Sequence, residues 1–174
     1  MPFLYNVSKM ANLNIIIREI NGAELIRCAE VIRESFKTVA SELGLTRDNI
    51  PNHPSFLTVE ELRGLVDKDI KFFGLFLGDR QIGSVAVQAA DDGVYFLQKL
   101  AVLPEYRNDG YGRELVSFVI DYVKHNDCKK LALGIWDVQT GLKEWYLRLG
   151  FTVNSTRDFE HLPLTVCLMD MEIN

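Results

Sequence analysis

Residues 107–112 read Arg-Asn-Asp-Gly-Tyr-Gly and lie between an apolar run, residues 94–103, and an amphipathic stretch that begins at Arg113. This order predicts a strand, a glycine-containing turn and a helix. Such a turn directs several backbone N–H groups and the positive end of the helix at one point, which is how a main chain holds a phosphate. The glycines allow the ligand to approach the backbone closely. We therefore expect an anion-binding turn here.

The composition predicts one globular domain. The chain has 174 residues, of which 48% are hydrophobic, enough for one core and too few residues for two ordinary domains. We expect a loosely held lead-in over residues 1–13 and a single domain over 14–174. The formal net charge of −5 gives no general attraction to nucleic acid or to an anionic membrane, so we expect neither as a partner.

The cysteines and the hydropathy pattern bear on location. Cys28, Cys128 and Cys167 are odd in number and lack the close spacing of a zinc site or a redox pair, which is typical of free thiols in a reducing compartment. We predict no metal site. No apolar run is long enough to cross a bilayer, and residues 1–14 lack the features of a signal peptide. These features favour a cytoplasmic protein.

Hydrophobic periodicity predicts an α/β fold with a mixed sheet, in the order β-α-α-β-β-β-α-β-α-β-β. Asp92-Gly93 is typical of a hairpin turn, and Thr58 with Glu61 forms a capping-box pattern at a helix start. The loop over residues 44–57 is long enough to suggest a functional role. The expected strands cover residues 14–20, 71–77, 81–89, 94–103, 129–136, 151–160 and 163–173. Two helices are expected over residues 25–39 and 142–149, a short helix after Thr58, and another helix after Gly112.

Two ordered motifs support a family resemblance. Residues 100–112, Leu-Ala-Val-Leu-Pro-Glu-Tyr-Arg-Asn-Asp-Gly-Tyr-Gly, resemble the fourth strand and the Arg/Gln-x-x-Gly-x-Gly/Ala diphosphate loop of the GNAT superfamily of acyl-CoA-dependent N-acetyltransferases. Residues 145–151, Trp-Tyr-Leu-Arg-Leu-Gly-Phe, resemble that family's aromatic-Tyr-x-x-x-Gly-Phe segment. The resemblance implies a GNAT-like fold in which the fourth and fifth strands splay apart.

The resemblance also implies a binding mode for acetyl-CoA, as co-substrate, between the splayed strands. Its pantetheine arm would pair with the backbone of Leu100, Ala101 and Val102, which also serve as core residues. Gln139 stands where the family often has Asn, so we assign it no ligand role. The diphosphate would contact Arg107, Asn108, Asp109, Gly110, Tyr111, Gly112 and Arg113. In the alternative interpretation, the two arginines are only solvated surface residues.

The catalytic assignments carry competing interpretations. The family's tyrosine corresponds to Tyr146, whose hydroxyl could protonate the leaving thiolate, although a core tyrosine is the alternative. The attacking amine must lose a proton, and Glu105 is the nearest carboxylate in sequence, although a solvated loop residue is the simpler interpretation. The candidates for the acceptor site are Glu34, His53 and His161. In the alternative interpretation, the two histidines are simple turn residues.

These observations predict an acetyltransferase that moves the acetyl group of acetyl-CoA to a primary amine by direct attack. A small-molecule amine is the leading acceptor, and the negative net charge favours a cationic one such as a polyamine or an aminoglycoside. A protein lysine or N-terminal acetyltransferase is the first alternative. A non-catalytic acyl-CoA sensor is an alternative of another class. The sequence is compatible with a homodimer.

Overall fold

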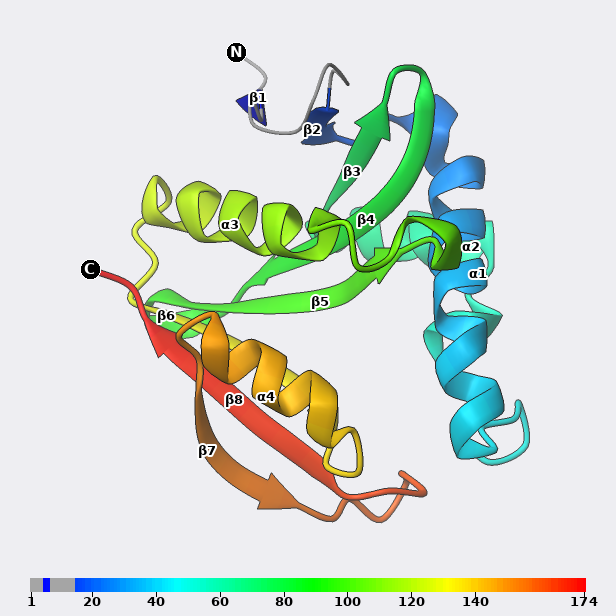
Figure 1. Cartoon of the computed structure of the whole chain (residues 1–174), viewed down its shortest axis with the longest axis vertical. Coiled ribbons are helices and arrows are strands. Elements are labelled where there is room, and N and C mark those ends of the chain that lie inside the picture. Colours follow the sequence, from blue (N-terminus) through cyan, green and yellow to red (C-terminus); the bar gives the residue numbers. More distant parts are fainter. Residues whose placement is uncertain (1–4, 7–14) are drawn as a thin grey trace.

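The computed structural model describes residues 5–6 and 15–174, which form a mixed sheet flanked by helices (Figure 1). The eight strands are hydrogen-bonded in the order β1-β2-β3-β4-β5-β6-β8-β7. The strands are β1 (Tyr5–Asn6), β2 (Ile15–Glu19), β3 (Lys71–Leu77), β4 (Arg80–Ala89), β5 (Val94–Val102), β6 (Lys130–Trp136), β7 (Thr152–Arg157) and β8 (Val166–Glu172). The helices are α1 (Leu25–Leu43), α2 (Val59–Val66), α3 (Tyr111–Lys124) and α4 (Thr140–Arg148), with short 3-10 turns that include η2 (Pro54–Phe56) and η4 (Pro104–Tyr106).

The predicted α/β class and element order are confirmed, with one addition. Tyr5–Asn6 pair with β2 as the short strand β1, so the fourth and fifth strands of the sequence prediction are β5 and β6. The rest of the lead-in expected over residues 1–13 lies outside the described residues. The Thr58–Glu61 capping box is present, with both reciprocal hydrogen bonds, and α1 ends at Gly44, whose φ of 63° is a conformation that favours glycine.

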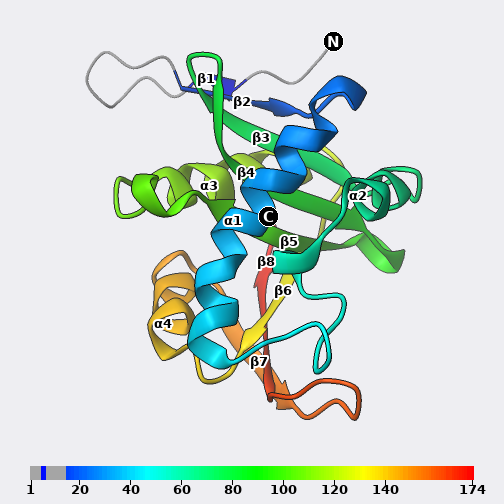
Figure 2. The same ribbon diagram turned by 90° about the vertical axis from the view of Figure 1, so that its right-hand side faces the viewer.

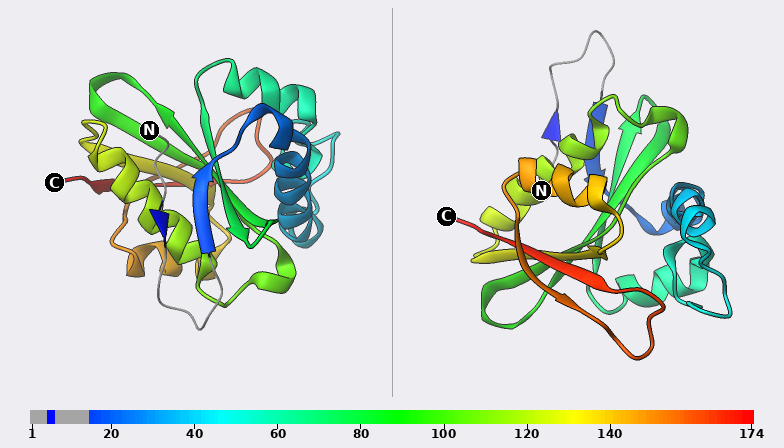
Figure 3. Two further views of the ribbon diagram at one scale, coloured as in Figure 1. Left: turned by 90° about the horizontal axis from the view of Figure 1, so that it is seen from above. Right: turned by 60° about the horizontal axis from the view of Figure 1, so that its bottom comes forward.

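The helices cover opposite faces of the sheet (Figures 2 and 3). Helices α1 and α2 pack on one face around a core that includes Ile32, Leu62 and Phe72. Helix α3 packs on the other face, where Phe118 contacts Phe73 with ring centroids 4.8 Å apart. Tyr146 of α4 belongs to this second core. The sheet therefore separates two hydrophobic cores, and any opening between strands connects the two faces.

Such an opening lies between β5 and β6. The two strands pair in parallel only from Val94 to Phe96, opposite Lys130 to Ala132. Strand β6 continues to Trp136 against β8, and β5 continues to Val102 against β4. Since each strand keeps its other neighbour, the two strands diverge as a V beyond Phe96, as the resemblance implied.

Candidate active site

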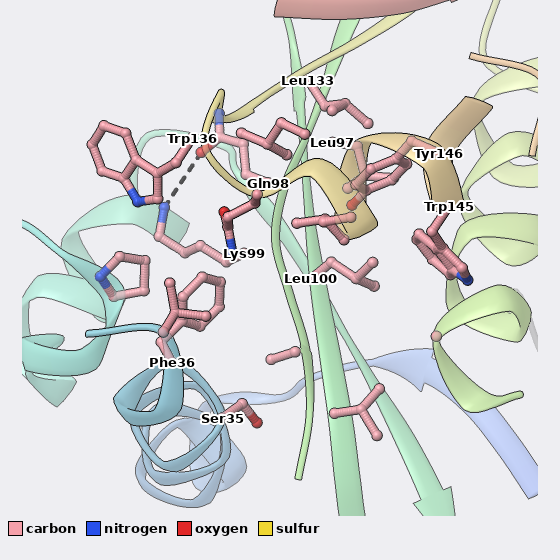
Figure 4. A pocket seen from close by; sticks show the side chains of 18 of the residues that line it. Ser35, Phe36, Leu97, Gln98, Lys99, Leu100, Leu133, Trp136, Trp145 and Tyr146 are labelled. Carbon is pink, nitrogen blue, oxygen red and sulfur yellow. Dashed lines mark hydrogen bonds between the residues drawn. The ribbon is translucent and has the colours of Figure 1, made fainter. Parts of the chain in front are cut away.

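A pocket of about 1170 Å³ occupies this V (Figure 4). It is larger than the roughly 300–1000 Å³ of a site for one small ligand. Its walls come from β5, β6, α1, the loop before η2, the turn before α3, the start of α3 and one side of α4. The volume and the open strand edges suit a long ligand that lies between two strands, with room for a second molecule at one end.

The glycine turn provides unpaired backbone donors at the α3 end of the pocket. The N–H groups of residues 108–113 donate to no group in the described part of the chain, and the first donor of the helix is the N–H of Glu114, which bonds to the Gly110 carbonyl at 3.1 Å. Asn108 and Gly110 have φ angles of 68° and 87°, which turn the chain so that these donors gather at the start of the helix. This is the arrangement that binds phosphate groups.

Arg107 lines the pocket, but its guanidinium group bonds to protein. It donates to the Val102 carbonyl at 3.1 Å, to Thr38 Oγ1 at 2.9 Å and to the Ser35 carbonyl at 2.6 Å. The side chain thus ties the turn to α1. At this end of the pocket, the donors that remain for an anion are the backbone N–H groups and exposed Arg113, which also lines the pocket.

A bulge interrupts β5 inside the pocket. Between the pairs Ser84–Ala101 and Ala86–Gln98, one residue of β4 faces two residues of β5, Lys99 and Leu100. Lys99 has a φ of 49°, an uncommon conformation for a residue with a side chain. Strain of this kind persists where the surrounding structure enforces it, often at functional sites. The bulge turns the Lys99 side chain into the pocket, on the side where Trp136 lies (Figure 4).

Tyr146 projects from α4 toward β5 and is only 4% exposed (Figure 4). Its ring packs against Trp145 and Phe151 at centroid distances of 4.9 and 5.4 Å. Burial raises the pKa of its hydroxyl well above the ordinary value of 10.0, so the group stays protonated at neutral pH. The residue lines the pocket, and its hydroxyl makes no hydrogen bond to the described residues. A protonated donor is thus available to a ligand.

The α1 side of the pocket differs in character from the α3 side. Phe36 and Trp136 form apolar walls, and His53 is 4% exposed between Phe36 and Phe56. The Nδ1 atom of His53 accepts the Ser55 N–H at 3.3 Å and lies 2.8 Å from Ser55 Oγ, which leaves the ring proton on Nε2 in the neutral form. Burial lowers the pKa of this imidazole.

Four of the candidate residues lie outside the pocket lining, namely Glu34, Glu105, Tyr111 and His161. The side chain of Tyr111 is buried in the core beneath α3 and does not face the pocket. Glu105 is exposed on η4, and its carboxylate accepts a hydrogen bond from Arg80 at 3.1 Å. Glu34 is exposed on α1, and His161 is exposed and lies against the Phe159 ring at 5.9 Å. The pocket brings together the other predicted site residues: Tyr146, His53 and residues 100–102, 107–110, 112 and 113.

The sequence prediction missed Lys99 and Trp136 and set Gln139 aside. Gln139 lines the pocket at the N-terminus of α4, where its side chain makes no capping hydrogen bond. No sequence signal identifies Lys99, because the bulge depends on the register between β4 and β5. Within residues 5–6 and 15–174, no helix is long and apolar enough to cross a membrane, and no cluster of three His, Cys, Asp or Glu side chains could hold a metal ion.

Comparison with known proteins identifies the family. Residues 33–151 match the description "Acetyltransferase (GNAT) family". An uncharacterized N-acetyltransferase of Staphylococcus aureus is 33% identical over 115 residues, covering 59% of this chain and 73% of that protein. Another from Bacillus velezensis is 32% identical over 84 residues, covering 41% of this chain and 52% of that protein.

Solved structures share the fold at lower identity. The ribosomal-protein-S18-alanine N-acetyltransferase of Escherichia coli superposes with a TM-score of 0.73 and 16% identity, covering 92% of this chain and 94% of that chain. The PaiA N-acetyltransferase of Thermoplasma acidophilum, in complex with coenzyme A, gives a TM-score of 0.70 and 22% identity, covering 91% and 98%. The pocket between β5 and β6, the turn that precedes α3 and the family match lead to one conclusion: the chain belongs to the GNAT family of acetyltransferases.

Proposed function

We propose that the chain transfers the acetyl group of acetyl-CoA directly to a primary amine of a small molecule. The observation that carries the proposal is the pocket itself, which has unpaired N–H groups at its α3 end and the Tyr146 hydroxyl facing the gap between the strands. Two structural neighbours of this family contain the cofactor, one with coenzyme A and one, from Elizabethkingia anophelis, with acetyl-CoA.

The residues present fit acetyl-CoA. The N–H groups of residues 108–113 would bind its diphosphate. The backbone of Leu100 to Val102 would pair with its pantetheine arm, since no strand of the described residues pairs with that edge of β5. The thioester supplies an activated acetyl group. Tyr146 holds the proton that the leaving thiolate requires, and its raised pKa keeps that proton in place until the charge develops.

The packing around the other end of the pocket supports a small acceptor. Ala40, Leu45 and Ile50, from the end of α1 and the loop after it, form a hydrophobic cluster with Trp136. Leu162 and Leu164, from the loop between β7 and β8, pack against the same cluster. A protein substrate needs a groove open at both ends, whereas this cluster joins the two loops across one end. His53, in the same wall, would contact the acceptor.

The test is turnover with a panel of amines, followed by release of coenzyme A and by mass spectrometry of the products. Cys28, Cys128 and Cys167 are all buried, so a thiol reagent reports coenzyme A with little background from the protein. We expect release that depends on a small amine, an acetylated amine in equal amount, and no acetylated protein. Turnover only with peptides would favour the protein-modifying alternative. Binding of acetyl-CoA with no turnover for any amine or peptide would favour a sensor.

A further inference from the structure

The acceptor end of the pocket contains a cation without a counterion. Lys99 lines the pocket, and its ammonium group makes one hydrogen bond within the described residues, to Gln98 Oε1 at 3.3 Å (Figure 4). It takes part in no ion pair there. The ammonium can donate three hydrogen bonds, so two are left for a ligand.

The carboxylates of the pocket lie elsewhere. Among the described residues that line it, the acidic ones are Asp109, in the glycine turn, and Glu114, in the first turn of α3. Both are at the end of the pocket that binds the diphosphate in the proposed function. Phe36, Trp136 and His53 surround the acceptor end and carry no negative charge. Among the described residues of the pocket, this partly buried positive charge therefore has no counterion, and an anionic ligand would offset the cost of its partial desolvation.

We propose that the acceptor is an amine that also carries a carboxylate, and that Lys99 binds this carboxylate. The proposal rests on the proposed function and specifies its substrate class: an amino acid or a related amino carboxylate with an apolar body that fits against Phe36 and Trp136. Charge-assisted hydrogen bonds of this kind are among the stronger polar contacts in proteins. A polyamine or an aminoglycoside would instead place further positive charge beside Lys99, with no carboxylate there to compensate.

The strained backbone supports a binding role for this side chain. The φ of 49° at Lys99 belongs to the bulge that turns its side chain into the pocket. Burial also lowers the pKa of the ammonium, as expected for a cation that lacks a partner in the absence of ligand. A carboxylate bound beside it would favour the charged form.

The test compares matched amines that differ only in the carboxylate: phenylalanine with phenethylamine, and leucine with 3-methylbutylamine. The measured quantity is the ratio of kcat/KM for the amino acid to kcat/KM for its decarboxylated analogue. Each pair also differs in amine pKa, so the ratio is compared between the wild type and Lys99→Met, where that difference cancels. We expect the ratio to fall by about ten- to a hundredfold in Lys99→Met, the loss typical of one hydrogen bond to a charged group.

Two further variants serve as controls. Lys99→Arg retains the charge and should keep most of the preference, whereas Lys37→Met removes an exposed lysine on α1 that does not line the pocket and should leave the ratio unchanged. An unchanged ratio in Lys99→Met would overturn the proposal. An equal loss of kcat for both members of a pair would also overturn it, because Lys99 would then act on the reaction and not on the carboxylate.

A binding measurement separates this proposal from the proposed function. Calorimetric titration of phenylalanine into the wild type saturated with coenzyme A should show binding that Lys99→Met weakens by a similar factor. Phenylalanine binding that depends on Lys99, without any acetyl transfer, would support the carboxylate site and refute the enzyme activity. Transfer to spermidine in preference to every amino acid, with no effect of Lys99→Met, would support the activity and refute the carboxylate site. If Lys99→Met fails to fold, Lys99→Gln provides the same comparison.

Discussion

Replacing Tyr146 by Phe tests the assignment of the proton donor. The change removes one hydroxyl and keeps the ring between Trp145 and Phe151. Because the hydroxyl bonds to none of the described residues, its removal leaves no unpaired protein partner there. We expect the free energy of unfolding to change by about 1 kcal/mol or less, since a lost hydroxyl is costly mainly when a partner stays behind.

The expected effect on catalysis is much larger. Loss of a positioned proton donor should lower kcat by roughly ten- to a thousandfold, which is about 1.4–4 kcal/mol of transition-state stabilisation. The dissociation constant of acetyl-CoA, measured by calorimetry, should stay within a factor of about two, because the hydroxyl would act on the charge that forms during reaction. Burial raises the pKa of Tyr146, so its hydroxyl should add no titration limb to the kcat profile between about pH 6 and 9.

The matched control is Tyr95→Phe, which removes a hydroxyl that donates to the Asn126 carbonyl at 2.8 Å outside the pocket. It should reduce stability and leave kcat unchanged per folded molecule. Wild-type kcat in Tyr146→Phe would refute the proton-donor role. Loss of stability in Tyr146→Phe with normal kcat would assign the tyrosine to the core alone.

The remaining predictions concern Gly112, Arg107 and His53. Gly112→Glu should strongly weaken acetyl-CoA binding in a calorimetric titration, because it places a carboxylate at the diphosphate. Gly112→Ala should bind acetyl-CoA normally, because its Cβ would meet Trp145 at an ordinary distance of 3.5 Å. Equal binding by the two variants would refute the assignment of the turn. Arg107→Met removes three hydrogen bonds that join the turn to β5 and α1. Its free energy of unfolding, measured in urea, should therefore fall by about 1–3 kcal/mol. An unchanged free energy of unfolding would show that these bonds do not stabilise the fold. His53→Asn should raise the KM of the acceptor without changing acetyl-CoA affinity. Because burial lowers the pKa of His53 in the folded protein, the unfolded chain binds this proton first as the pH falls. The stability of the wild type relative to His53→Asn should therefore decline below about pH 6.5. A difference in thermal midpoint that stays constant with pH would contradict the burial of a neutral ring.

Local signals made most of the fold predictable. The period of α1 and the Thr58 capping box depend on residues a few positions apart, so they can be read from the sequence directly. The hairpin turns and the helix between β5 and β6 fix the sense of those strands, which explains why the mixed sheet was predicted correctly. The strand pairing of Tyr5–Asn6 was missed because a two-residue strand has no detectable period.

The site was less predictable, because it depends on contacts between distant segments. Lys99 enters the pocket through a bulge set by the register of β5 against β4, and Arg107 bonds to residues of α1 that lie 69 and 72 positions away in the chain. Likewise, the exposure of Glu105 follows from the position of η4 and its contact with Arg80. Motifs therefore placed the backbone of the turn at the pocket, because its position depends on local geometry. They placed side chains there less well, because the partners of side chains are set by the whole fold.

A crystal structure of the protein with acetyl-CoA would test the central claim most directly. We expect the diphosphate on the N–H groups of residues 108–113 and the pantetheine arm along Leu100 to Val102 between β5 and β6. The thioester sulfur should lie within about 3.5 Å of the Tyr146 hydroxyl. The acetyl group should face the end of the pocket that contains Lys99 and His53. A cofactor bound elsewhere would refute the assignment of the pocket as the acetyl-CoA site, and a thioester beyond hydrogen-bonding reach of Tyr146 would refute its role as proton donor.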